Sequence, residues 1–220
     1  MYTKHQWNSD KHFNFKYALY LPKDYDETKK YPLVFFLHGA GERGDDAELS
    51  CRNGFMQHVR DEGREYPFIY VSPQCPEGKF WACYTESIHA FIDYICDTLP
   101  VDRNRICLTG LSMGATGLWT IAMADTSKFC CLAAVCGNSP SWNAHLLKDI
   151  PICMYHGDCD DVVPLTGSTN MLKVNRVGGR AKLTILHGVG HNAWDYAYAD
   201  PELLDWILAQ RKDQNTLPTE

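Results

Sequence analysis

The sequence has no apolar stretch near the roughly 20 residues that a membrane-spanning helix requires. Residues 1–16 are polar and aromatic and lack the hydrophobic core of a signal peptide. Basic residues are not in excess, since the formal net charge is -6, and we expect neither a nucleic-acid nor a membrane partner. These absences predict a cytoplasmic protein, or a secreted one if a signal peptide has been removed. Nothing in the sequence sets an oligomeric state.

Ten cysteines are present, yet none of them forms a C-x-x-C pair. Cys107, Cys136 and Cys153 lie in apolar runs, where a thiol behaves as a small hydrophobic group. No histidine and cysteine cluster has the spacing of a zinc site. We therefore expect free thiols and no metal or cofactor. Cys75 and Cys83 are the one pair whose loop setting allows a disulfide.

Length and composition predict one soluble domain over residues 1–211, followed by a polar tail at 212–220. Seven apolar runs are typical of strands: Phe15–Leu21, Leu33–Leu37, Phe68–Ser72, Ile106–Gly110, Leu132–Cys136, Ile152–His156 and Lys182–Leu186. Helical spacing of apolar residues marks Glu86–Leu99, a segment that begins near Leu165, and Pro201–Arg211. Strands that alternate with helices predict an α/β fold, with a mostly parallel sheet, helices on both faces and no large lid domain.

Ser112 lies at the centre of the sequence G-L-S-M-G, directly after one of the predicted strands. A serine on a tight turn from strand to helix takes a strained backbone conformation that exposes its hydroxyl group. Side chains two residues before and two residues after it would clash, which explains Gly110 and Gly114. The small and apolar stretch at 115–124 is typical of a helix packed on a sheet. The pattern predicts a nucleophile, with a structural turn as the alternative.

A general base is expected on the same edge of the sheet, because sites in parallel sheets form at the carboxyl ends of the strands. His191 follows the last predicted strand in the glycine-rich sequence G-V-G-H-N, and such a loop can carry an imidazole to Ser112. His187 is the second choice. His38 and His156 each follow an apolar strand and precede a glycine, which favours a structural role.

The acid that orients the base has three candidates, Asp158, Asp160 and Asp161, which follow another predicted strand. The role requires a buried carboxylate that accepts a hydrogen bond from the histidine. The other two would be solvated or would cap the following turn. Composition alone does not choose among them.

Acyl transfer also needs two backbone N–H groups aimed at the developing oxyanion. We expect one from Met113, which follows the nucleophile, and one from Ala40 in the loop L-H-G-A-G-E-R-G after an early strand. The same loop contains G-x-G-x-x-G, so a dinucleotide-binding site is a rival hypothesis. That fingerprint needs an acid near the end of the next strand, and Phe68–Ser72 continues into Pro-Gln without one.

Four segments together resemble the compact α/β-hydrolases of the phospholipase/carboxylesterase type, in the feruloyl-esterase-like branch whose members are also labelled predicted peptidases. They read LHGAGERG, VDRNRICLTGLSMGATG, HGDCDDVVP and GHNAWDYAY, and the resemblance covers roughly residues 15–211. It implies Asp160 as the acid and Ala40 and Met113 as the oxyanion donors. Ala115 departs from the family, which commonly has a second glycine at that position.

The resemblance implies hydrolysis of a small ester by a two-step acyl transfer that needs no cofactor. Loop aromatics that could line the pocket are Trp81, Trp142 and Trp194, with burial in the core as the alternative for each. The segment between Cys136 and the acid loop is too short for a large lid, so we expect short-chain or aromatic acyl groups rather than long lipids. A serine peptidase of the same fold is one alternative, and an inactive hydrolase fold used for binding is another.

Overall fold

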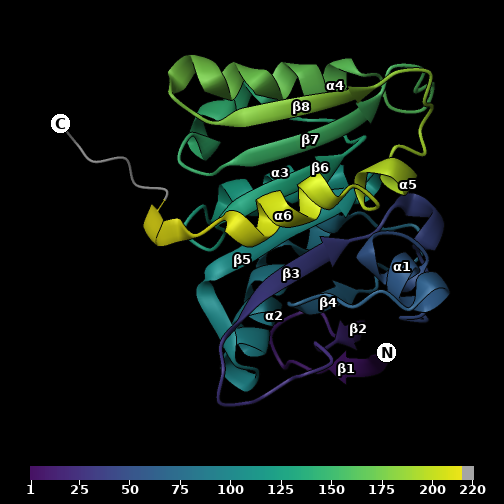
Figure 1. Ribbon diagram of the computed structural model, residues 1–220, viewed down its shortest axis with the longest axis vertical. Coiled ribbons are helices and arrows are strands. Elements are labelled where there is room, and N and C mark those ends of the chain that lie inside the picture. The colour runs from purple at the N-terminus through teal and green to yellow at the C-terminus, as the bar shows by residue number, and fades with distance from the viewer. Residues whose placement is uncertain (215–220) are drawn as a thin grey trace.

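An eight-stranded sheet forms the centre of the computed structural model, which describes residues 1–214 (Figure 1). The strands are β1 (Tyr2–Trp7), β2 (Phe15–Tyr20), β3 (Tyr31–Leu37), β4 (Ile69–Pro73), β5 (Val101–Leu111), β6 (Cys131–Val135), β7 (Ile152–Gly157) and β8 (Ala181–Leu186). Their order across the sheet is β1-β2-β4-β3-β5-β6-β7-β8. β2 is antiparallel to both β1 and β4, and the remaining neighbours are parallel. The predicted fold class is therefore confirmed.

Helices cover both faces of this sheet (Figure 1). The α-helices are α1 (Phe55–Glu62), α2 (Thr85–Thr98), α3 (Met113–Ala124), α4 (Thr166–Thr169), α5 (Trp194–Ala197) and α6 (Pro201–Ala209). Short 3-10 helices are η1 (Ala40–Glu42), η2 (Leu49–Cys51), η3 (Trp81–Tyr84), η4 (Ser141–Leu147), η5 (Asn170–Val177) and η6 (Lys212–Gln214). The buried faces of α2 and α3 belong to one hydrophobic core, and those of α1 and α6 to the other.

The central strand β3 shows why the sheet has two cores. Leu33, Phe35 and Leu37 point into the core under α2 and α3, whereas Val34 and Phe36 point into the core under α1 and α6. Successive side chains of a strand face opposite sides, so a strand covered on both faces is apolar throughout. This explains why the central strands read as continuous hydrophobic runs.

The ends of the sheet depart most from the sequence-based expectations. β1 was not expected, because four of its six residues are exposed and its sequence is polar. The helix α1 was also not expected, and the helical pattern near Leu165 is divided into the short α4 and the 3-10 helix η5. Of the predicted tail at 212–220, the first three residues form η6, and 215–220 lie outside the described residues.

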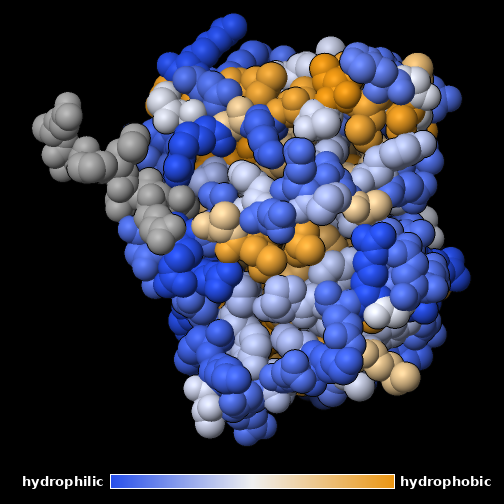
Figure 2. Space-filling view, viewed as in Figure 1, coloured by the Kyte–Doolittle hydropathy of each residue, from blue (hydrophilic) through white to orange (hydrophobic). Residues whose placement is uncertain are grey.

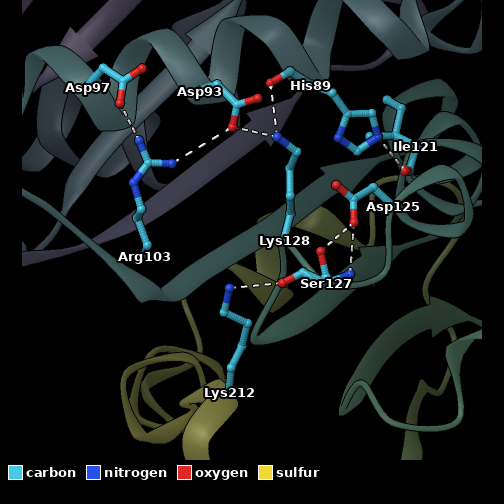
Figure 3. Close-up of polar contacts among 9 residues, drawn as sticks. All are labelled: His89, Asp93, Asp97, Arg103, Ile121, Asp125, Ser127, Lys128 and Lys212. Carbon is cyan, nitrogen blue, oxygen red and sulfur yellow. Dashed lines mark hydrogen bonds and ion pairs between the residues drawn. The ribbon is translucent and has the colours of Figure 1, made fainter.

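A charged network ties α2 to the start of β5 and to the segment before β6 (Figure 3). Asp93 on α2 pairs with Lys128 and with Arg103. Lys212 donates a hydrogen bond of 2.8 Å to the carbonyl oxygen of Ser127. The network lies at the amino-terminal ends of the parallel strands, and such surface ion pairs contribute little stability individually. The opposite edge of the sheet carries the site described below.

The surface over α6 and β8 is mostly hydrophilic, with hydrophobic side chains gathered over β8 and beside α6 (Figure 2). β8 is one of the two edge strands, and its Ile185 is 38% exposed. No helix within residues 1–214 is long and apolar enough to cross a membrane.

Candidate active site

Ser112 occupies the sharp turn between β5 and α3. Its φ of 51° and ψ of -117° are strained for a residue with a side chain. The turn is held by the Ser112 N–H, which donates to the carbonyl oxygen of Val135 at 2.9 Å. A Cβ atom on Gly114 would lie 1.9 Å from the Leu37 carbonyl oxygen, and one on Gly110 would lie 2.8 Å from it. The glycines on both sides of the serine are therefore required by space, as the sequence predicts.

The side chain of Ala115 fits in the structure because its neighbour, Gly137, has no side chain. The Ala115 side chain is fully buried, and a Cβ atom on Gly137 would lie 2.5 Å from the Ala115 Cβ. The Ala115 methyl group therefore fills space that Gly137 leaves open.

His191 reaches the serine from the loop between β8 and α5. Its Nε2 lies 2.8 Å from Ser112 Oγ, and its side chain is 17% exposed. The loop is anchored by the Cys159 N–H, which donates to the Val189 carbonyl oxygen at 3.0 Å. The ring of Trp194 meets the imidazole edge to face, with the centroids 5.3 Å apart. The structure thus brings together two groups from distant parts of the sequence.

Asp160 lies on the loop after β7 and completes the chain of hydrogen bonds. His191 Nδ1 donates to its Oδ2 at 2.8 Å. Its other oxygen accepts from the N–H groups of Val162 and Val163, each at 2.9 Å. Burial acts to raise the pKa of this carboxyl group, but the hydrogen bonds from His191, Val163 and Val162 outweigh that effect and lower it. The carboxylate is therefore ionised and fixed in place.

The other carboxylates of this loop have different positions. Asp158 pairs with His187, the second-choice base, through a contact of 2.8 Å between His187 Nδ1 and its Oδ2. Its Oδ1 accepts from the N–H of Gly188 at 2.7 Å. Asp161 is exposed. Of the three candidate acids, Asp160 is the one that contacts His191.

His156 lies next to Asp160, although the sequence analysis assigned His156 a structural role. It is fully buried at the end of β7, and its Nε2 lies 2.9 Å from the Val163 carbonyl oxygen and 3.2 Å from Asp160 Oδ2. Both neighbours are acceptors, so Nε2 carries the proton. Nδ1 accepts from the hydroxyl group of Ser168 at 2.7 Å. A spacing of four residues indicates a contact on a helix but not at the end of a strand, so no sequence pattern predicted this contact.

The loop after β3 lies directly against the serine. A Cβ atom on Gly39 would lie 3.6 Å from Ser112 Cβ. Ala40 begins η1, and Met113 begins α3. N–H groups in the first turn of a helix have no intrahelical partner, so the two predicted oxyanion donors belong to helix starts. The amino end of α3 also carries the positive end of its helix dipole, which favours an anion.

Buried polar contacts hold this loop in place. Asn53 donates to Glu42 Oε1 at 2.8 Å, and the side chain of Gln74 donates to the Glu42 carbonyl oxygen at 2.7 Å. Burial raises the pKa of Glu42. His38 accepts from the Cys75 N–H at 3.0 Å, and burial lowers its pKa to about 4, so it is neutral. The G-x-G-x-x-G segment, residues 39–44, contains the 3-10 turn η1 and does not open the α-helix of a dinucleotide site.

The three tryptophans named from the sequence occupy three different settings. Trp81 is fully buried and donates its indole N–H to the His38 carbonyl oxygen at 2.9 Å. Its assignment to the pocket wall is therefore wrong, because a core ring cannot face a substrate. Trp142, on η4, is 77% exposed. Trp194 contacts His191 directly.

The cysteines are thiols, as expected. All ten lie within the described residues, and the buried Cys75 and the exposed Cys83 are not bridged to each other. One of them joins the site: Cys136 Sγ, an oxygen of Asp160 and a nitrogen of His191 lie within 4.8 Å of one another. These are potential metal ligands, brought together by three separate loops, which sequence spacing could not show.

Comparison with known protein families shows which family the chain belongs to. The family model described as Phospholipase/Carboxylesterase matches residues 66–200. The chain belongs to this family. Together with the sheet order, the match identifies an α/β-hydrolase fold of the carboxylesterase type.

Two curated relatives are esterases by name. The probable feruloyl esterase C of Aspergillus terreus is 28% identical over 162 residues, which are 71% of this chain and 58% of that protein. The feruloyl esterase C of Emericella nidulans is 28% identical over 166 residues, with the same shares of the two chains. The chain therefore spans little more than half the length of these curated relatives.

Solved structures agree on the fold. A thermostable esterase superposes with a TM-score of 0.87 at 30% identity, covering 96% of this chain and 63% of that one. A ferulic acid esterase from Anaeromyces mucronatus, in complex with ferulic acid, superposes with a TM-score of 0.69 at 19% identity, covering 96% and 90%. The second likeness shows the fold alone.

Proposed function

We propose that this carboxylesterase-family protein hydrolyses carboxylic esters through a triad of Ser112, His191 and Asp160. The observation that carries the proposal is the continuous hydrogen-bonded chain from Ser112 Oγ to His191 and on to Asp160, with 2.8 Å at each contact. An ionised Asp160 fixes the His191 tautomer that leaves Nε2 free to accept the serine proton.

The reaction begins when His191 Nε2 takes the proton of Ser112 as its oxygen attacks the ester carbonyl. The N–H groups of Ala40 and Met113 stabilise the oxyanion, and the ester C–O bond breaks as His191 returns the proton to the leaving alcohol. Water then attacks the acyl-enzyme with His191 again as the base. The bond between the acyl group and Ser112 breaks as His191 returns this proton to Ser112 Oγ, which leaves the carboxylic acid and free Ser112.

The substrate class that we propose is an ester with a short-chain or aromatic acyl group. The segment between β6 and β7 contains only the short η4, which leaves no element of the size of a lipase lid. Trp194 beside the catalytic imidazole supplies an aromatic surface at the site. Two of the curated relatives are named feruloyl esterases, which supports the aromatic part of the proposal.

A fluorophosphonate probe provides the direct test, because it reacts covalently only with an activated serine. We expect labelling of the wild-type protein and no labelling of Ser112→Ala. Acetyl, butyryl, octanoyl and feruloyl esters, assayed in parallel, would then define the acyl group. Labelling that persists in Ser112→Ala, or hydrolysis of none of the esters, would contradict the proposal.

The peptidase alternative is tested with a matched pair of substrates that share one acyl group and differ in p-nitrophenol or p-nitroaniline as the leaving group. An amide leaving group must be protonated by His191 as it departs, and a peptide must also be held extended along a groove. We expect kcat/KM for the ester to exceed that for the amide by at least about 10³, roughly 4 kcal/mol of barrier. Comparable values would favour a peptidase.

A further inference from the structure

Cys136 has an unusual backbone conformation at the edge of the proposed active site. It follows β6 directly, is fully buried, and has a φ of 45°. Within residues 1–214, Ser112 is the only other non-glycine residue with a positive φ. Strained residues of this kind persist where the surrounding structure holds them, often at functional sites. Here the Cys136 N–H donates to the Tyr155 carbonyl oxygen at 2.8 Å.

The thiol faces two further metal-binding groups. Cys136 Sγ, one oxygen of Asp160 and one nitrogen of His191 lie within 4.8 Å of one another. Sulfur, imidazole nitrogen and carboxylate oxygen are the three ligand types of Zn²⁺, whereas Mg²⁺ and Ca²⁺ prefer oxygen alone. The donor set therefore matches a soft divalent cation.

The geometry requires only a small closure. Tetrahedral zinc holds its N, O and S ligands about 3.3–3.6 Å apart, so the most distant donors must approach by at most about 1 Å. Asp160 is fixed by the N–H groups of Val162 and Val163, which suits a ligand with outer hydrogen bonds. The movement falls to His191, whose loop begins at Gly188 with a φ of 74°. Its imidazole is partly exposed and provides the route of entry.

We propose that Cys136, Asp160 and His191 form an inhibitory binding site for a thiophilic divalent cation, with Zn²⁺ as the expected ligand. The inhibitory effect, although not the binding, rests on the proposed esterase function. Coordination at His191 Nδ1 would replace the proton that Asp160 accepts, and coordination at Nε2 would occupy the lone pair that takes the serine proton. Either mode stops general-base catalysis.

Binding converts the thiol into a thiolate ligand. The S–H bond breaks, a sulfur–metal bond forms, and the proton passes to water.

The first test measures esterase activity against buffered free Zn²⁺, with each variant compared with its own metal-free rate. We expect inhibition of the wild type that EDTA reverses and that Mg²⁺ does not reproduce. Cys136→Ser and Cys136→Gly should each raise the half-inhibitory Zn²⁺ concentration at least about tenfold, since the loss of even an outer-shell partner costs 10–100-fold in metal affinity. The glycine variant also relieves the positive φ, which guards against misfolding.

Cys159→Ser is the matched control, because this exposed thiol lies next to Asp160 in sequence but contacts Asp158 instead. It should keep the inhibition of the wild type. Relief by Cys159→Ser, equal inhibition of both Cys136 variants, or no inhibition of the wild type would each overturn the inference.

The second test uses Co²⁺, whose bond to a thiolate gives a charge-transfer absorption band. The band should appear in wild-type and Ser112→Ala proteins and should be lost in both Cys136 variants. This readout needs no catalysis. A Cys136-dependent band in a protein without esterase activity would refute the proposed function alone. An active esterase with no band would overturn the metal site alone.

Discussion

Two histidine–aspartate pairs lie on the same two loops, after β7 and after β8. His191 with Asp160 and His187 with Asp158 each have a contact of 2.8 Å between Nδ1 and Oδ2. The side chains of the first pair are 17% and 0% exposed, whereas those of the second are 86% and 31% exposed. The same chemistry is thus found in two different environments.

The comparison shows that a hydrogen bond between these residue types does not itself make a catalytic unit. Removal from water strengthens the interaction between His191 and Asp160, while solvent screens the pair of His187 and Asp158. The buried pair also has Ser112 on the second imidazole nitrogen. The exposed pair instead holds the turn at Gly188, from which the His191 loop departs.

The largest effect on catalysis is expected when the Ser112 hydroxyl group is removed, because this group contacts the buried pair and not the exposed one. Ser112→Ala should lower kcat by about 10⁴–10⁶, because covalent catalysis disappears while binding and the oxyanion donors remain. His191→Ala should cost a similar factor, and the double variant should be no worse than either single one, since the two act as a unit. Steady-state kinetics with an ester measures all three. Additive losses in the double variant would argue against a shared mechanism.

The two acids provide the next comparison. Asp160→Asn should lower kcat by about 10⁴ by allowing the wrong tautomer of His191. Asp158→Asn should stay within about threefold of the wild type, as is usual for exposed positions. Asp161→Asn serves as a second exposed control. If Asp158→Asn proved the more damaging change, the assignment of the acid to the buried pair would be wrong.

The sequence predicted the parts of this arrangement that depend on local pattern. Buried strands such as β3 are apolar throughout, and the glycines around Ser112 follow from backbone clashes, so both could be predicted. The polar edge strand β1 carries no such pattern. Composition could not choose among three aspartates on one loop, because the choice depends on burial and on the position of His191.

The sequence could not predict how Cys136 and Trp81 lie relative to other segments. The approach of Cys136 to Asp160 and His191 depends on how the ends of β6, β7 and β8 align in the sheet. Trp81 was named as a loop residue that could line the pocket or be buried, and η3 packs it into the core against Gly117, where an added Cβ would lie 2.4 Å from its Cβ. Tertiary packing decided both cases.

His156 sharpens the comparison, because it contacts the acid of the buried pair. Its Nε2–H donates to the Val163 carbonyl oxygen and lies 3.2 Å from Asp160 Oδ2, so we expect His156 to position the carboxylate. His156→Leu should lower kcat by about 10-fold, because a polar N–H group beside the charged carboxylate is lost, with a smaller change in KM. His156→Gln, which can place a donor near the Nε2 position, should recover part of the loss. Equal losses in both variants at equal thermal stability would assign the residue to packing alone.

The smallest effect is expected for the stability provided by the exposed pair. The hydrogen bonds from His187 and from the Gly188 N–H lower the pKa of Asp158. A carboxyl group with a lower pKa in the folded state stabilises the protein above the pKa of the unfolded chain, and that contribution is lost as pH falls through the folded-state value. Asp158→Asn should therefore lower Tm at pH 7 by at most about 3 °C, and the difference from the wild type should vanish in strong acid. Thermal melting of both proteins at neutral and acidic pH measures this, and a difference that grew toward acid would show that Asp158 is not held ionised by these contacts.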